Sequence, residues 1–227
     1  MTNIKHIAFI CDGNGRWAKK QHRERTYGHS VGSDVVKDIA IHLKKNYSLE
    51  KVSFYIFSTE NWKRPVVEVA FIIKMLDVKL NKWYKLFLEE NVKLKFIGSR
   101  NGLDKNLIKL FDKYEDLTKD CSEMTLNLCF NYGGRNEIVD AAKKIIENDI
   151  SVESLDEAEF SKYLYEPDDV DLLIRTSGEK RISNYFLWQL AYSEMIFLDC
   201  YWPELTFKMV DESIEQYMKR NRRFGGI

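Results

Sequence analysis

The sequence has no excess of either charge, because 35 lysine and arginine residues balance 35 aspartate and glutamate residues over 227 positions. Proteins that bind nucleic acid through their overall charge carry a basic excess, so we expect no nucleic-acid partner. No stretch of about 18 residues is free of charge, and no secretory signal peptide is visible. These observations argue against a membrane-spanning helix and predict a cytoplasmic protein.

Cysteine and proline are both scarce. The four cysteines, at positions 11, 121, 129 and 200, do not have the spacing of a metal site, so we expect free thiols in a reducing compartment. The three prolines stand at 65, 167 and 203, and no repeat, low-complexity tract or linker interrupts the chain. At this length we predict a single domain over residues 1–227.

Short apolar runs alternate with helical patterns along the chain. The runs predict strands over residues 5–11, 52–58, 92–97, 124–130, 170–175 and 195–199. The spacing of apolar residues predicts helices over about 30–46, 65–90, 103–120, 134–148, 153–164 and 206–221. This alternation is typical of an α/β fold with a mainly parallel central sheet of about six strands, flanked by helices on both faces.

The most informative segment follows the first predicted strand, where residues 11–17 read Cys-Asp-Gly-Asn-Gly-Arg-Trp. Open parallel sheets bind ligands at the carboxyl ends of their strands. Gly13 and Gly15 would let backbone N–H groups approach an anion there, and Arg16 would add a fork of donors. Asp12 would repel a diphosphate unless a divalent cation lay between them. The segment therefore indicates a diphosphate site with a metal at Asp12.

Two other interpretations of this loop stay open. An Asp-Gly dipeptide is most often an ordinary turn. The spacing of Gly13, Gly15 and Ala18 also matches a degenerate dinucleotide-binding fingerprint. That fingerprint requires an acid about 20 residues further on, whereas the first acid after the next predicted strand is Glu60. A nicotinamide site is therefore the weakest of the three interpretations.

Two more predicted strands end in polar segments that a plain core would not need. Residues 58–65 read Ser-Thr-Glu-Asn-Trp-Lys-Arg-Pro, and residues 175–184 read Arg-Thr-Ser-Gly-Glu-Lys-Arg-Ile-Ser-Asn. Guanidinium groups suit phosphate oxygens better than ammonium groups do. Each segment alone could be a cap, a turn or a surface ion pair, but three such strand ends together favour an anion site.

The predicted helix over 65–90 is apolar over more than one stripe of its surface. A helix packed between the sheet and its neighbours would show this pattern, and so would one wall of an apolar tunnel between sheet and helices. For a tunnel, we expect Ala70, Ile73, Met124 and Phe130 to face its interior.

Seven segments match the motifs of one enzyme family. They are 12–17, 28–29, 57–65, 131–135, 174–179, 181–184 and 222–226. In order and spacing they resemble the cis-prenyltransferases, and most closely the bacterial undecaprenyl diphosphate synthases. The resemblance implies repeated condensation of isopentenyl diphosphate onto farnesyl diphosphate with Z stereochemistry. The implied product is a polyprenyl diphosphate of eleven units that carries sugars for the cell wall.

The resemblance also implies roles for individual residues. Asp12 would be the catalytic carboxylate and would bind Mg²⁺, with Glu194 assisting the metal. The allylic diphosphate would be held by Gly13, Asn14, Gly15, Arg16, Arg25 and His29. The diphosphate of isopentenyl diphosphate would be held by Arg175, Arg181 and Ser183. Trp17 and Ile182 would be further substrate-binding residues. A mobile segment closing over both substrates would contain Ser58, Thr59, Glu60, Asn61, Trp62 and Arg64.

Asn61 is the residue that the family pattern assigns as the proton acceptor. A neutral amide is a poor base. Our hypothesis is that Asn61 orients Ser58 or a diphosphate oxygen, and that the released diphosphate takes the proton. Two residues, Lys180 and Phe130, depart from the family pattern. The lysine still suits a diphosphate, and we interpret the phenylalanine as core.

The resemblance further implies a homodimer, in which residues 222–226 reach the partner's site, and delivery of the product to the inner face of the membrane. The rival interpretation is a non-catalytic partner subunit of a heteromeric prenyltransferase. Such subunits lose the loop over residues 12–16, which is intact here.

Overall fold

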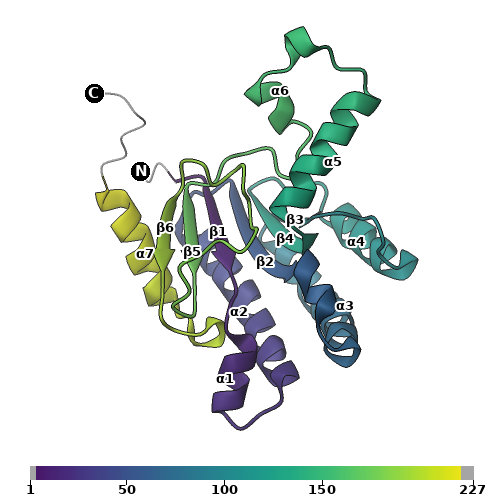
Figure 1. Ribbon diagram of the computed structural model, residues 1–227. Helices are drawn as coiled ribbons and strands as arrows, with labels where there is room; N and C mark the ends of the chain where they lie inside the picture. Colours follow the sequence, from purple (N-terminus) through teal and green to yellow (C-terminus); the bar gives the residue numbers. More distant parts are fainter. Residues whose placement is uncertain (1–3, 221–227) are drawn as a thin grey trace.

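A computed structural model describes residues 4–220, which are built around one six-stranded sheet (Figure 1). The strands are β1 (His6–Ile10), β2 (Lys51–Ser58), β3 (Val92–Ile97), β4 (Met124–Tyr132), β5 (Leu172–Arg175) and β6 (Glu194–Phe197). Their order across the sheet is β3-β4-β2-β1-β5-β6, and every neighbouring pair is parallel. All six predicted strands are confirmed, and their carboxyl ends lie at one edge.

The helices mostly follow the predicted pattern. They are α1 (Asn14–Lys20), α2 (Arg25–Asn46), α3 (Val66–Glu89), α4 (Lys105–Leu117), α5 (Gly134–Glu147), α6 (Glu157–Ser161) and α7 (Phe207–Lys219). Three short 3-10 turns are η1 (Thr59–Lys63), η2 (Val152–Ser154) and η3 (Trp202–Glu204). Helix α1 was not predicted, α2 begins earlier than expected, and the helix expected over 153–164 is two short pieces. In the first two cases the helical residues are mainly polar, so hydrophobic periodicity does not reveal them.

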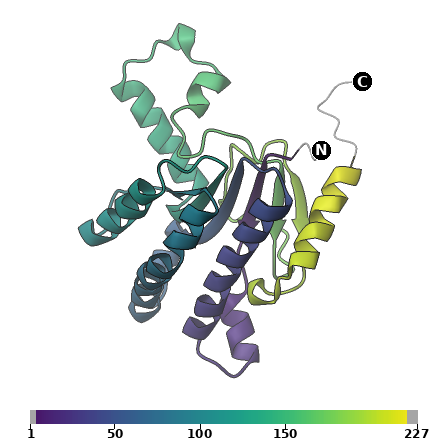
Figure 2. The same cartoon turned by 180° about the vertical axis from the view of Figure 1, so that it is seen from behind.

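Alternate residues of the strands supply two cores. In β1, Ile7 and Phe9 belong to one buried cluster, whereas Ala8 and Ile10 belong to the other. Helices α2, α3, α4 and α7 lie side by side over the first face of the sheet (Figure 2). Trp202 is fully buried there, with its ring edge against Phe9 and its indole nitrogen donating to the Gly32 carbonyl of α2 at 2.7 Å.

The second face differs from the expectation of helices on both sides. Its cluster contains strand and loop residues, with Tyr185, Phe186 and Leu190 supplied by the loop between β5 and β6. Phe186 is fully buried although its φ is +43°, a left-handed conformation that is costly for a bulky side chain. This loop therefore packs as a structured layer, and its first half carries the polar segment predicted to bind an anion.

Helices α5 and α6 project away from the sheet as an arm (Figures 1 and 2). The arm exposes Val139 and Ile146, seven residues apart on α5, and Val152 in η2. Within residues 4–220, no helix is both long and apolar enough to span a bilayer.

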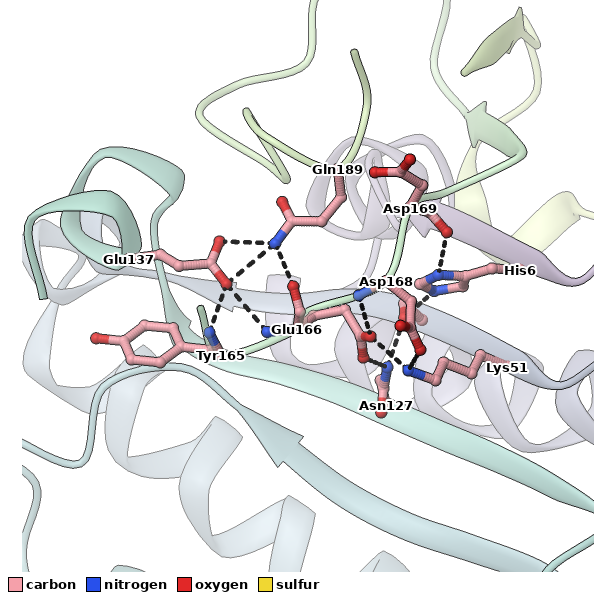
Figure 3. Close-up of polar contacts among 10 residues, drawn as sticks. His6, Lys51, Asn127, Glu137, Tyr165, Glu166, Asp168, Asp169 and Gln189 are labelled. Carbon is pink, nitrogen blue, oxygen red and sulfur yellow. Dashed lines mark hydrogen bonds and ion pairs between the residues drawn. The ribbon is translucent and has the colours of Figure 1, made fainter. Parts of the chain in front are cut away.

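A buried polar network ties the sheet to the loop before β5 (Figure 3). His6 Nδ1 donates to the Asp169 carbonyl at 3.0 Å, so its Nε2 accepts from Ser53 Oγ at 2.7 Å. Asn127 donates to both Ser53 and Glu166, at 3.0 and 2.6 Å. Burial lowers the pKa of His6, which keeps the ring neutral. Ser53 is fully buried, so this serine–histidine pair is structural.

Candidate active site

Asp12 and Arg175 face each other at the carboxyl edge of the sheet. Asp12 follows β1, and Arg175 ends the neighbouring strand β5. Arg175 NH2 lies 3.0 Å from Asp12 Oδ2, and Arg16 NH2 lies 3.1 Å from the same oxygen. The Arg175 side chain is only 3% exposed, so this carboxylate is the main counter-charge of a buried guanidinium.

Arg175 also holds the loop that follows β5. Its NH1 donates to Ser183 Oγ at 2.8 Å and to the Arg181 carbonyl. Ser177, Ser183 and Asn184 of this loop have φ of +79°, +51° and +62°. Left-handed conformations of non-glycine residues occur mainly where surrounding contacts enforce them, often at functional sites. The structure therefore brings Arg175, the Arg181 carbonyl and Ser183 together, whereas the Arg181 side chain is 62% exposed and pairs with Glu179.

The loop after β1 packs tightly against the same segment. Gly13 has a φ of +103°, and a Cβ atom there would lie 2.2 Å from Ser177 Oγ. Only glycine fits both conditions. The loop then enters α1, where Arg16 NH1 contacts Glu179 Oε1 at 3.1 Å, and Glu179 also pairs with Arg181. Glu179 therefore links the two predicted diphosphate sites, a role that we did not predict from sequence.

A second carboxylate, Glu68 of α3, contacts three further predicted site residues. Arg25 Nε lies 3.1 Å from Glu68 Oε2, while His29 Nε2 and Arg64 NH1 lie 3.1 and 3.4 Å from Oε1. Glu68 is 6% exposed. An acid in the first turn of a helix is expected from the helix dipole alone, so the sequence carries no separate signal for this role.

Burial and ion pairing act in opposite directions on this cluster. Burial alone would raise the pKa of Glu68, but hydrogen bonds from Arg25 and His29 lower it below its ordinary value of 4.5. Burial also lowers the pKa of His29, and the hydrogen bond to Glu68 offsets this only in part. At neutral pH the cluster therefore holds an ionised glutamate, two guanidinium groups and a neutral imidazole.

Glu68→Gln is expected to lower the free energy of unfolding by about 1–2 kcal/mol at pH 7, because a buried carboxylate loses its charge-assisted bonds. The folded-state pKa of Glu68 is depressed, so its contribution is complete above about pH 4.5 and is lost as pH falls through the folded-state pKa. Denaturant unfolding from pH 7 to acid should therefore show the variant and the original chain converging. Glu89→Gln, on the exposed face of the same helix, is the control. A difference that stays constant over pH would contradict this assignment.

The segment after β2 forms η1 through a reciprocal cap. The Ser58 N–H donates to Asn61 Oδ1 at 3.1 Å, and the Ser58 side chain accepts from the Asn61 backbone N–H. This geometry agrees with the hypothesis that Asn61 orients Ser58. Trp62 is 40% exposed, and its indole nitrogen donates to Asn131 Oδ1 at 2.8 Å.

The turn after β4 provides the surface on which η1 rests. A Cβ atom at Gly133 would lie 2.7 Å from Thr59 Oγ1 and 2.9 Å from Asn184 Nδ2. Asn184 in turn donates to Glu60 Oε1 at 3.1 Å. The motif over 131–135 thus seats η1 against the loop that carries Arg181. The resemblance includes this motif, but the sequence predicted no role for it.

One cavity of about 600 Å³ joins this edge to the interior. At the strand ends it is lined by Asp12, Asn14, His29, Ser58, Glu60, Asn61, Arg64, Arg175 and Ser183. Further in, its lining is mainly apolar and includes Ile72, Met75, Leu76, Leu126, Leu128 and Phe130. Of the four positions expected to face a tunnel, Phe130 lines the cavity. Ala70 is exposed, Ile73 packs at the edge of the core and Met124 is buried within it, so those three expectations are wrong.

Several predicted residues lie nearby or elsewhere. Trp17 stacks on Tyr27 with ring centroids 5.7 Å apart, and Ile182 packs against the second core. Glu194 begins β6 in register with Leu172 and pairs with Arg220, so within one chain it lies at the opposite edge from Asp12. The segment 222–226 lies outside the described residues.

The donor set at Asp12 suits one hard cation. No group of three histidine, cysteine or acidic side chains that could hold a metal exists within residues 4–220. Mg²⁺, however, is usually bound by one or two carboxylates together with substrate phosphates and water. Both ion pairs of Asp12 use Oδ2, so Oδ1 is the oxygen that a cation would meet. Asp12 therefore fits a magnesium site that substrate oxygens complete.

Comparisons with known proteins agree with this geometry. Residues 10–225 match the family model of undecaprenyl diphosphate synthase. The isoprenyl transferases of Fusobacterium nucleatum and Bacillus subtilis are each 43% identical over 98% of this chain, and the alignments cover 96% and 88% of those proteins.

Two solved structures share the fold over nearly all of both chains. Lavandulyl diphosphate synthase from Lavandula x intermedia, in complex with dimethylallyl diphosphate, superimposes with a TM-score of 0.93 at 28% identity and 99% coverage of both chains. A probable undecaprenyl diphosphate synthase from Campylobacter jejuni gives 0.85 at 33% identity and 100% coverage of both. This chain therefore belongs to the undecaprenyl diphosphate synthase family and is a cis-prenyltransferase.

Proposed function

We propose that this enzyme condenses isopentenyl diphosphate repeatedly onto farnesyl diphosphate, with a Z double bond at each addition, to give undecaprenyl diphosphate for the cell-wall lipid carrier. The proposal treats residues 1–227 as one catalytic domain. The cavity is the main support, because it joins an edge lined by Arg64 and Arg175 to an apolar interior. A diphosphate fits the first part and a growing hydrocarbon tail fits the second. The dimethylallyl diphosphate in the lavender enzyme is an allylic diphosphate of the proposed kind.

The charges at the edge suit loss of an allylic diphosphate. As the carbon–oxygen bond breaks, negative charge grows on the departing diphosphate, and preorganised cations stabilise that charge most. Arg16 and Arg25 would receive the allylic diphosphate together with His29, whereas Arg175, Arg181 and Ser183 would hold isopentenyl diphosphate. When bound at Asp12, Mg²⁺ would supply further charge neutralisation at the leaving group.

Proton removal follows formation of the new carbon–carbon bond. Asn61 orients Ser58 through the cap of η1, and the released diphosphate takes the proton. In that case Asn61→Asp should introduce no new ionisation that governs the pH–rate profile above pH 6. A new ionisation controlling turnover would instead identify residue 61 as the base.

The decisive assay incubates the purified chain with farnesyl diphosphate, isopentenyl diphosphate and Mg²⁺, and separates the products by chromatography. We expect a ladder of Z-prenyl products that ends near eleven isoprene units. Turnover by this chain alone would also exclude a non-catalytic subunit. No product beyond farnesyl diphosphate would overturn the proposal.

A homodimer and a peripheral membrane contact complete the proposal. Val139, Ile146 and Val152 are 52–85% exposed on the arm, which supports burial against a second copy. Sedimentation of the purified chain tests this assembly.

Val66 and Val67, at the start of α3, are 82% and 79% exposed. They follow Arg64, which lines the cavity, and this position supports product delivery to a lipid surface. Flotation with lipid vesicles tests that contact.

A further inference from the structure

Two lysines line the apolar part of the cavity, where a hydrocarbon sleeve would not need them. Lys37 belongs to α2 and Lys79 to α3. At 1.5 Å rise per residue, Lys79 lies about 16 Å along α3 from Glu68, and Lys37 lies about 12 Å along α2 from His29. Both are therefore well removed from the diphosphate edge. Among the residues that line the cavity, they are the charged ones at this depth.

Both lysines are mostly covered, and their ammonium groups pair with carboxylates that are more exposed. The side chains of Lys79 and Lys37 are 15% and 22% exposed, whereas those of their partners, Asp34 and Asp38, are 42% and 49% exposed. Lys79 Nζ lies 2.6 Å from Asp34 Oδ2, which ties α3 to α2 across the cavity wall. Long cationic side chains commonly cover apolar surface in this way while their charges stay near water.

The two ammonium groups share one aromatic ring. Trp83 of α3 is 8% exposed, and Lys79 and Lys37 lie over its indole at 5.2 and 5.9 Å from the ring centroid. At this depth the wall between α2 and α3 thus consists of two flexible stems, an ion pair and an indole. We call the Lys79–Asp34 pair seated on Trp83 the seam.

The fully buried side chains of the deep wall are much firmer. Phe87 and Leu126 line the cavity near Trp83 and are 2% and 1% exposed, packed within the main core. Displacing such residues opens voids in close-packed surroundings, whereas an ion pair whose carboxylate is 42% exposed opens by rotation of side chains alone. A chain that outgrows the cavity therefore meets its least resistance at the seam.

We propose that the seam is the closure through which a hydrocarbon tail longer than the cavity must pass, so that Lys79 and Asp34 determine product length. This inference rests on the proposed function. While the seam is closed, growth stops when the tail fills the cavity. When it is weakened, the tail threads between α2 and α3 and more units are added.

The test measures the product distribution and the rate of the first condensation in variants of the seam. Lys79→Ala is expected to lengthen the main product by at least one isoprene unit without changing the first condensation. Lys79→Met keeps the apolar stem and removes the charge, so it should lengthen the main product by less than Lys79→Ala does. This variant provides the test if the alanine variant folds poorly. Asp34→Lys should also lengthen the product. The double change Asp34→Lys with Lys79→Glu re-forms the pair and should shift the distribution back.

Lys82→Ala is the matched control, because Lys82 is exposed on the same helix, next to Trp83. If the original chain makes polyprenyl products and all seam variants give the same distribution, the inference fails and the proposed function stands. If the double change fails to restore the distribution, the ion pair is not the determinant. If the original chain forms no polyprenyl product, the proposed function fails and the inference fails with it.

Discussion

Asp12→Asn is expected to lower the turnover of condensation by at least about 10²–10³-fold while the chain stays folded. The amide keeps the shape of the side chain but cannot offer a metal ion an anionic oxygen. Turnover with saturating substrates and Mg²⁺ gives the first measurement, and denaturant unfolding gives the second. We expect turnover to fall sharply while the variant still unfolds as a folded protein does.

Asp12→Ala adds a cost in stability that the asparagine variant avoids only in part, because an amide oxygen can still accept a hydrogen bond from Arg175 but cannot balance its charge. Without a polar side chain, the buried Arg175 loses its bond to Asp12 Oδ2, and we expect a further loss of about 1–3 kcal/mol in the free energy of unfolding. Asp112→Asn, an exposed acid on α4, should change neither quantity. If turnover fell only in proportion to the unfolded fraction, Asp12 would be a structural residue.

Arg175→Lys is expected to raise the KM for isopentenyl diphosphate by roughly 10- to 150-fold, with little change in the KM for farnesyl diphosphate. A lysine keeps the positive charge, but it cannot contact Asp12, Ser183 and the Arg181 carbonyl as the guanidinium does. Steady-state kinetics with each substrate varied in turn provide the measurement.

The crossed comparison is Arg25→Lys, at the predicted allylic site. Its side chain is 57% exposed and pairs with Glu68 rather than with Asp12 or Glu179. We expect this change to raise the KM for farnesyl diphosphate and to leave that for isopentenyl diphosphate nearly unchanged. Equal increases in both constants for both variants would contradict the assignment of two separate diphosphate sites.

The sheet could be predicted because each parallel strand is a short, nearly continuous apolar run. The rotation of α3 about its axis, which decides which of its residues face the cavity, could not be predicted. This helix is apolar on several sides, so the pattern does not say which residues face the cavity, and Ile72 and Leu76 line it where Ala70 and Ile73 were expected. Helix α1 was not predicted, because its residues are mostly polar and its position is set by the loop before it.

The candidate site was predictable where a strand ends in a distinctive segment, as at Asp12 and Arg175. It was not predictable where the site depends on a contact between two elements that are far apart in the sequence. Arg25 and Glu68 are 43 residues apart, and nothing in either local pattern indicates their contact. The position of Glu194 likewise follows from strand register, which places it opposite Leu172 and away from Asp12.

The carboxylates Asp12, Glu68 and Glu179 have a consequence for how substrates bind. The arginines that would receive a diphosphate already have anionic partners. Substrate entry is then an ion exchange, in which a tethered anion gives way to a mobile one, rather than the filling of a bare cationic pocket. Added salt competes with both anions alike, so affinity should depend on ionic strength less steeply than the number of arginines would suggest. The same tethered anions keep the arginines in place between one substrate and the next.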